Sequence, residues 1–427
     1  MSTVETLLAD FAHRPVTGED ARRMMRLSVF DWAACGIAGA DEPVAAILRD
    51  RALSDGGRDE AAVIGGGRLP ARAAAVVNGT ISHALDYDDT HFAHIGHASV
   101  GVLPAALAMA EVTGADMATM VDAALVGVES AVRVGVWLGR GHYELGFHQT
   151  ATAGAFGATL AAARLLRLDP ARTVAAVGLA ATRASGLKSQ FGTMGKPYNA
   201  GLAAETGVES ARLAAKGFTS SPTGLSGGLG FGPTHAGIAD LSGFDGIGQR
   251  WLFETVSHKF HACCHGLHAM IEAVLASGAT AKTTDRVQIR TNPRWMTVCN
   301  QPAPVTGLEA KFSYRLTCAM ALSGVDTSAI GVFTDATAAR PDLIALRDRV
   351  YVIADAEVGE MASRVTIHRT DGQSVTATFD LDAPISLEAR ETRLRRKGAG
   401  LLGATKSDRL FAAAMGGDLS ALIRELA

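Results

Sequence analysis

Apolar residues recur at helical spacing through most of the first two thirds of the chain, and this periodicity constrains the fold more than any other feature. It predicts helices over eight segments: 21–38, 44–53, 71–90, 100–112, 116–138, 150–166, 170–186 and 200–216. Helix-start signals recur, as where Asp169 stands before Pro170 as an N-cap. Because the connections are short and a strand pattern occurs only at 61–64, we expect an all-helical body.

The periodicity changes from helical to alternating near residue 285. Three segments alternate: 286–291, 363–370 and 373–380. The last two are joined by Asp371-Gly372, a strong hairpin signal. Helical patterns lie between them at 310–322 and 341–350, and another follows at 406–427. The chain is therefore predicted to be mostly α, with a helical domain of residues 1–268 completed by 386–427, and a smaller α+β domain of residues 269–385.

Composition excludes several classes of protein. A formal net charge of -3 gives no long-range attraction for nucleic acid or for an anionic membrane. The five cysteines form no CxxC pair, which suits a reducing cytoplasm, and no stretch resembles a signal peptide or a membrane span. The glycine-rich segment 63–79 lacks the G-x-G-x-x-G spacing of a dinucleotide site. We expect a soluble cytoplasmic protein that binds neither nucleic acid nor membrane.

The segment 83–99, HALDYDDTHFAHIGHAS, concentrates ionisable residues in a chain that is only 19% charged. If the preceding helix continues to Thr90, then His83, Asp86 and Thr90 share one of its faces, and the loop containing His97 arches over that face. A solvated turn is the plain alternative, because acidic residues at a helix end followed by histidines are usual there. A metal site is a further alternative, but no H-E-x-x-H pair or compact ligand pattern supports it, so no metal is predicted.

Three later stretches also contain ionisable groups that core packing does not require. They contribute His148 (146–154), Lys196 (191–201), and Lys259 with His268 (257–269). A lone lysine is normally solvated, but the glycine-rich and apolar residues around Lys196 would desolvate its ammonium in a loop between Gly195 and Pro197. Together these residues offer cations to bind carboxylates and imidazoles to move protons. That set suits abstraction of a proton next to a carboxylate, followed by loss of a leaving group or return of the proton.

Four ordered blocks resemble the MmgE/PrpD family, which includes 2-methylcitrate dehydratases, cis-aconitate decarboxylases and iminodisuccinate epimerase. The blocks are HALDYDDTH, GFHQTATAGAFGATLAAARLLRLD, GKPYNAGLAAETGVESARLAAKGFT and LEAKFSYRLTCAMAL, so the resemblance extends to about residue 325. It implies a helical domain made from both chain ends, an inserted α+β lid and a homodimer. It also implies a site in the cleft without metal or organic cofactor.

The resemblance also implies roles for single residues. Asp86 and Thr90 would line the pocket, and His97 and His148 match active-site histidines. Lys196 matches the lysine of a GKP-type loop, and Lys259 the lysine of a K-x-x-x-C block. We therefore expect His97, His148, Lys196 and Asp86 to be catalytic, and Thr90, Lys259, His83 and His268 to bind substrate.

Three positions depart from the family pattern. The chain has Ala98 where proline is common, Tyr198 where histidine is common, and Leu316 where the decarboxylases are expected to have a tyrosine, with Tyr314 close by. Dehydration of a small di- or tricarboxylate in the 2-methylcitrate style is the first choice of function. Epimerisation of an iminodisuccinate-like substrate, cis-aconitate-type decarboxylation and a non-enzymatic polycarboxylate-binding protein are the alternatives.

Overall fold

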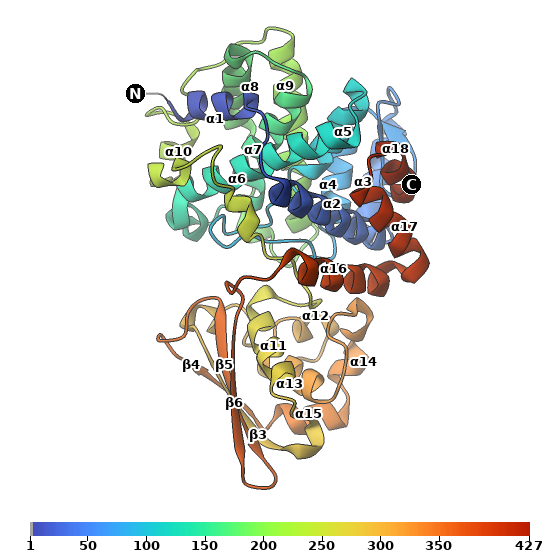
Figure 1. Cartoon of the computed structure of the whole chain (residues 1–427), viewed down its shortest axis with the longest axis vertical. Coiled ribbons are helices and arrows are strands. Elements are labelled where there is room, and N and C mark those ends of the chain that lie inside the picture. The colour runs from blue at the N-terminus through green and yellow to red at the C-terminus, as the bar shows by residue number, and fades with distance from the viewer. Residues whose placement is uncertain (1–2) are drawn as a thin grey trace. The chain divides into compact units, whose positions relative to one another are not determined.

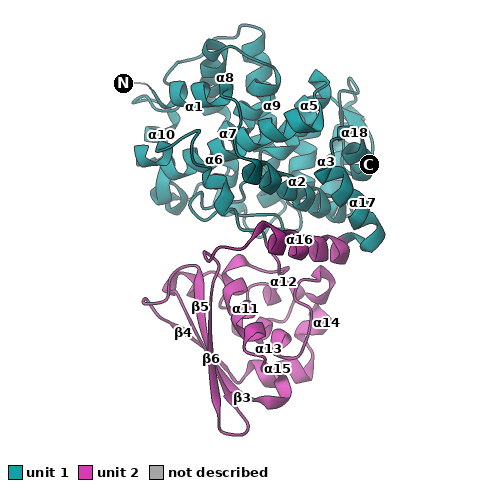
Figure 2. Cartoon of the chain, viewed as in Figure 1, with its two compact units in different colours: residues 1–258, 402–427 teal, residues 259–401 magenta. Residues whose placement is uncertain are grey.

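The computed structural model describes residues 3–427, and the chain divides into two compact units, coloured separately in Figure 2. Unit 1 holds the chain up to His258 together with Leu402–Ala427, and unit 2 is Lys259–Leu401. The fold is mostly helical, as predicted. The predicted limits of the folding domains, 1–268 with 386–427 and 269–385, stay a prediction.

Unit 1 is built from helices, and each of the eight predicted helical segments contains one (Figure 1). The helices are α1 (Val4–His13), α2 (Glu19–Gly39), α3 (Pro43–Asp55), α4 (Ala71–Ser82), α5 (Leu103–Thr113), α6 (Met117–Leu145), α7 (Gln149–Leu165), α8 (Pro170–Arg183), α9 (Gly195–Ala215), α10 (Phe231–Thr234), α17 (Ala404–Met415) and α18 (Leu419–Leu426). The predicted strand at 61–64 is β1 (Ala61–Ala62), which pairs with β2 (Arg68–Leu69). In the last stretch of the chain, α17 packs on α2.

Helix α7 forms the centre of unit 1, and nearly all of its residues are buried. It packs closely against α6 and α9, while α9 also packs against α4. Small residues make these approaches possible: a Cβ on Gly157 of α7 would collide with the backbone carbonyl of Gly127 on α6. The alanine- and glycine-rich composition is thus used to bring helix backbones together. The N-terminus of α7 thereby becomes a rigid support for the residues beside it.

Unit 2 combines one sheet with short helices, in agreement with the predicted change of periodicity. Its strands are β3 (Thr284–Thr291), β4 (Val350–Ala354), β5 (Ala362–Arg369) and β6 (Ser374–Asp380), in the order β4-β3-β5-β6. Strand β4 is parallel to β3, and the other pairs are antiparallel. The predicted hairpin joins β5 to β6, and Gly372 in its turn has the positive φ of 84° that this position favours.

Helices cover one part of that sheet. They are α11 (His268–Ala276), α12 (Gly307–Ala310), α13 (Tyr314–Leu322), α14 (Asp335–Ala338), α15 (Pro341–Arg347) and α16 (Leu387–Leu402), the last of which belongs to unit 2 as far as Leu401. Helix α11 packs against β5 and β6, and α13 packs against α11 and α15. Throughout residues 3–427, no helix combines the length and apolar character that crossing a membrane requires.

Two local predictions were wrong. Helix α4 ends at Ser82 and does not continue to Thr90, and Asp86 beyond it has a left-handed φ of 51°. The polar side chains that follow are engaged in tertiary hydrogen bonds, which override the helix propensity of the run. Lys196 was predicted in a loop but lies in the first turn of α9, because Pro197 is tolerated there without the loss of a helical hydrogen bond.

Candidate active site

Asp88 lies between two imidazoles in the turns that follow α4. Its Oδ1 is 2.8 Å from Nδ1 of His83, and its Oδ2 is 2.9 Å from Nδ1 of His97. The carboxylate is buried, as is His83. Because an ionised carboxylate only accepts hydrogen bonds, both Nδ1 atoms must carry hydrogen, and both rings direct Nε2 away from Asp88.

Neighbouring hydrogen bonds fix the turn that presents these side chains. Asp89 accepts hydrogen bonds from the backbone N–H and the hydroxyl of Ser99, and from the hydroxyl of Ser28 on α2. The backbone N–H of His97 donates to Thr150 Oγ1 in the first turn of α7, at 2.9 Å. The imidazole of His97 is therefore positioned from the rigid centre of unit 1.

His97 and Lys196 meet at Asp86. Nε2 of His97 lies 3.0 Å from Asp86 Oδ1, and Nζ of Lys196 lies 2.6 Å from the same oxygen. The Lys196 ammonium is also 5.5 Å from the ring centroid of Phe191. Basic and acidic side chains therefore alternate along a row of contacts, in the order Lys196, Asp86, His97, Asp88 and His83. Its most exposed member is Asp86, whose side chain is 37% exposed.

His148 stands at the N-cap position of α7 and approaches the same cluster. Its ring centroid is 6.3 Å from that of His83 and 5.0 Å from that of Phe191. The Asn199 side-chain N–H donates to His148 Nδ1 at 3.2 Å and also to the carbonyl of Leu187 at 3.2 Å. The second bond fixes the orientation of the Asn199 amide, because a carbonyl can only accept.

The pKa values of His83, His97 and His148 are shifted in different directions. Burial lowers the pKa of His83 to about 4 against the opposing charge of Asp88, and burial also lowers the pKa of His148 well below its usual value. Burial would lower the pKa of His97 too, but Asp88 and Asp86 raise it above its usual value. Burial would raise the pKa of Asp88, but His83 and His97 hold it well below the usual range. Among these three imidazoles, the surroundings of His97 favour the charged form, and those of His83 and His148 favour the neutral form.

The remaining predicted residues have contacts of their own. The Thr90 hydroxyl donates to the carbonyl of Ser257 at 3.4 Å, and the backbones of these two residues pair. Lys259 and His268 are buried in unit 2, where the ring of His268 lies 4.4 Å from that of His265 between centroids. The group that unit 1 brings together is thus His83, Asp86, His97, His148 and Lys196.

Sequence reasoning missed two residues that form hydrogen bonds to this group, Asp88 and Asn199. Asp88 lies in the segment 83–99, but Asp86 was predicted as the site residue, because helical spacing placed Asp86 on one face with His83. Asn199 follows Lys196 in the block GKPYNAG and had no signal of its own. An acidic residue five positions after a histidine and nine before another was the available signal for Asp88.

The cluster also has the composition of a metal site. Among the described residues, His83, Asp86, Asp88 and His97 offer ligand atoms that all lie within 4.8 Å of one another. Both nitrogens of His97 already face carboxylates, and the Lys196 ammonium already neutralises Asp86. A metal ion would have to displace a proton and an ammonium from these atoms, so the donor set fits hydrogen bonding better than metal binding.

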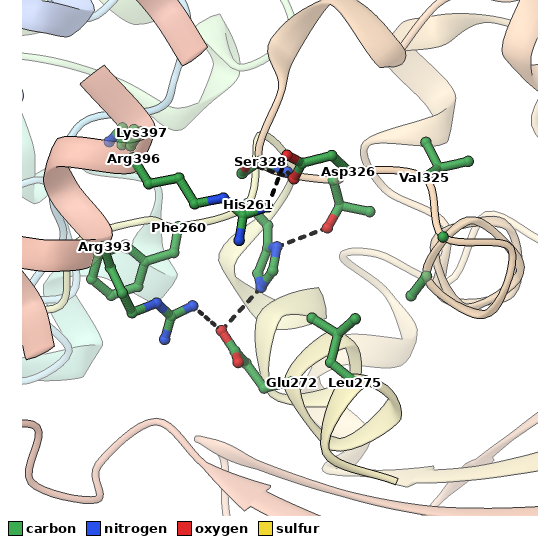
Figure 3. Close-up of a pocket in the computed structure, with 13 residues that line it drawn as sticks. Phe260, His261, Glu272, Leu275, Val325, Asp326, Ser328, Arg393, Arg396 and Lys397 are labelled. Atoms are coloured by element: carbon green, nitrogen blue, oxygen red, sulfur yellow. Dashed lines mark hydrogen bonds and ion pairs between the residues drawn. The ribbon is translucent and has the colours of Figure 1, made fainter. Parts of the chain in front are cut away.

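Unit 2 contains a cavity of about 500 Å³ beside a second imidazole–carboxylate pair (Figure 3). Nε2 of His261 lies 3.1 Å from Glu272 Oε1, and the Arg393 guanidinium pairs with the same carboxylate. Nδ1 of His261 bonds to the hydroxyl of Thr327 at 2.8 Å. These contacts tie α11 to α16 and to the segment after α13.

A buried group of neutral and charged imidazoles, a carboxylate with a strongly lowered pKa and a lysine is typical of enzymes that carry out acid–base chemistry. On a mostly helical fold this points to a particular family. The MmgE/PrpD N-terminal domain model matches residues 7–242, and the MmgE/PrpD C-terminal domain model matches residues 261–397. The chain belongs to the MmgE/PrpD family.

Relatives in this family are enzymes. A cis-aconitate decarboxylase of Aspergillus terreus is 27% identical over 91% of this chain and 86% of its own length. The human cis-aconitate decarboxylase is 28% identical over 78% of this chain and 74% of its own length. A cis-aconitate decarboxylase-like protein of Aspergillus oryzae, oryM, is 31% identical over 58% of this chain and 55% of its own length.

Proposed function

We propose that this chain catalyses proton abstraction next to a carboxylate of a small di- or tricarboxylate without a cofactor. Among the reactions that begin in this way, dehydration is our first choice. The observation that carries the proposal is the row of contacts Lys196–Asp86–His97–Asp88–His83, buried at its histidine end, in a member of the MmgE/PrpD family. Lysine and imidazolium are cations suited to carboxylates. Neutral imidazoles suit proton acceptance.

The chemistry assigns a role to each kind of group. When the proton leaves, charge builds up on the neighbouring carboxylate, and positive groups near that charge stabilise it. Lys196 would hold a substrate carboxylate beside Asp86. Thr90 and Lys259 stay predicted substrate-binding residues. His97, as the charged imidazole, would protonate the leaving hydroxyl group. Positioned proton transfer contributes about 10² to 10⁴ in rate.

Cis-aconitate-type decarboxylation is the second candidate, because the similar relatives from Aspergillus terreus and human are named for it. It needs the same cations, since CO₂ departure also leaves negative charge beside a carboxylate. Tyr314 is buried and directs its hydroxyl to the carbonyl of Gly266 and to Thr291. A tyrosine bound in this way serves the packing of unit 2. We therefore rank decarboxylation below dehydration as the proposed activity.

Proton NMR in heavy water with citrate, 2-methylcitrate, cis-aconitate and iminodisuccinate tests the proposal. Dehydration yields new alkene signals, decarboxylation removes a carboxylate carbon, and epimerisation introduces deuterium into an intact skeleton. We expect alkene formation from citrate or 2-methylcitrate, and its loss in His97→Gln. If a carboxylate binds but the protein neither converts it nor exchanges its hydrogens, the chain is a polycarboxylate-binding protein and the proposal is wrong. Assembly as a homodimer is a separate expectation, which mass measurement in solution tests.

A further inference from the structure

The hydrogen bonds of the cluster determine where each imidazole carries its protons. His97 faces a carboxylate with each ring nitrogen, so both nitrogens are protonated. His148 accepts at Nδ1 from the Asn199 amide, so its proton is on Nε2. His83 donates from Nδ1 to Asp88, burial favours its neutral ring, and its Nε2 faces no acceptor among the described residues, so Nε2 has a lone pair and no hydrogen.

Several buried polar side-chain atoms of the described residues lack a hydrogen-bond partner, and Nε2 of His83 is the one that belongs to the unit 1 cluster. Among the described residues, His83 Nε2 is buried and has no hydrogen-bond partner. An unsatisfied buried polar atom costs about 1–3 kcal/mol of stability. Such an atom in a native fold calls for an explanation, and a catalytic role is a recognised one.

We infer that Nε2 of His83 is the base that takes the substrate proton, with Asp88 as the positioning residue that holds His83 in the required tautomer. This inference rests on the proposed function and assigns the base of the same site. His148, with Nε2 already protonated and Nδ1 engaged by Asn199, then acts as a neutral hydrogen-bond donor and not as base. His97 and His148 both stay predicted catalytic residues, and in this assignment His97 is the acid and His148 a hydrogen-bond donor.

Atoms, protons and electrons balance in the proposed dehydration. The C–H bond breaks, its proton goes to His83 Nε2, and its electron pair forms the new C=C bond as the C–O bond breaks. The departing hydroxide takes the Nε2 proton of His97 and leaves as water. His83 is then charged and His97 neutral, and solvent returns one proton to His97 and removes one from His83.

The geometry couples the two steps. The rings of His83 and His97 lie 4.4 Å apart between centroids, and one carboxylate, Asp88, serves both. Two imidazolium ions at this separation repel each other, and the charge of His97 is one of the causes that keep the pKa of His83 low. When His97 gives up its proton, that repulsion ends, so His83 becomes a stronger base as the acid is consumed.

The variant His83→Asn separates a catalytic role from a structural one. The asparagine amide can donate to Asp88 roughly where Nδ1 does, but it has no basic nitrogen. On the carboxylate that the wild type converts in heavy water, we expect kcat and deuterium exchange to fall about 10² to 10⁴-fold, with little change in KM. His368→Asn is the matched control, because that histidine lies in strand β5 of unit 2 and its Nδ1 bonds to the hydroxyl of Ser374 on β6.

The outcomes distinguish this inference from the proposed function. A wild type that converts none of the four carboxylates contradicts the proposed function itself. A wild type that is active beside an H83N variant that loses less than about tenfold in kcat overturns the base assignment alone. If H83N does not fold, ¹⁵N NMR of the wild-type imidazoles still decides: a proton on Nε2 of His83 overturns the assignment, and a proton on Nδ1 alone supports it.

Discussion

The two units each contain a buried histidine–carboxylate pair, but the charge balance of the pairs differs. In unit 2, Glu272 is shared between His261 and Arg393, and a guanidinium does not give up its proton (Figure 3). In unit 1, Asp88 is shared between two imidazoles, and an imidazole, unlike a guanidinium, can give up or accept a proton. The first arrangement fixes secondary structure elements, and the second can move protons. This comparison is the reason that we propose the acid–base chemistry for unit 1.

Removing the two carboxylate charges is the strongest test of this contrast. We expect Asp88→Asn to lower kcat at least about 10³-fold, because a carboxylate that orients one catalytic imidazole contributes about 10⁴ in serine proteases and Asp88 orients two. Glu272→Gln should leave kcat unchanged and lower stability by about 1–3 kcal/mol, because Arg393 loses its partner. Steady-state rates and denaturant unfolding of both variants measure the two effects. Equal losses of activity would remove the distinction between the units.

A smaller effect is expected from the cation at the edge of the unit 1 cluster. Lys196→Ala should lower kcat/KM about 10²-fold, because a hydrogen bond to a charged group contributes about 1.5–3 kcal/mol. Lys188→Ala is the matched control: Nζ of Lys188 donates to the carbonyl of Tyr143 and lies over the Tyr143 ring. If the two variants lose the same activity, Lys196 does not hold the substrate.

These residues also show how far the sequence reaches. The β5–β6 hairpin and the unit 1 helices were predictable, because Asp371-Gly372 and apolar periodicity are local signals. The end of α4 was not predictable, because it depends on tertiary hydrogen bonds. Asp88 bonds to His83 and His97, and Asp89 bonds to Ser28 and Ser99. Three carboxylates stand within four positions, and spacing alone cannot tell which one faces the imidazoles.

The contact between Lys196 and Asp86 could be predicted only from the resemblance to a family. No periodicity connects two residues so distant in the chain, and α4 must first pack against α9 to bring them together. The hydrogen bond from Asn199 that sets the tautomer of His148 had no counterpart in the sequence at all. Sequence patterns identified the kinds of group in the site, and packing decided which nitrogen each imidazole presents.

The pH dependence of stability should differ between the units. The pKa of folded His97 is raised, so its contribution is complete below the unfolded pKa and is lost as pH rises through the folded value. The pKa of Glu272 is lowered despite burial, by His261 and Arg393, so its contribution is complete above the unfolded pKa and is lost as pH falls through the folded value. Melting temperatures from about pH 5 to about pH 9 should show the deficit of His97→Gln shrinking toward high pH, while that of Glu272→Gln persists. A pH-independent deficit in His97→Gln contradicts a charged His97.

The smallest effect is expected from removing metal, and it tests whether the unit 1 cluster is a proton site at all. A divalent ion held by Asp86, Asp88 and His97 would require a deprotonated ring nitrogen and would repel the Lys196 ammonium, 2.6 Å from Asp86. Activity should therefore be unchanged after dialysis against a chelator. A loss of activity that zinc restores would make the cluster a metal site. The protons assigned to Asp88 and its two imidazoles would then belong to a different mechanism, and the contrast with Glu272 would rest on an ion and not on proton mobility.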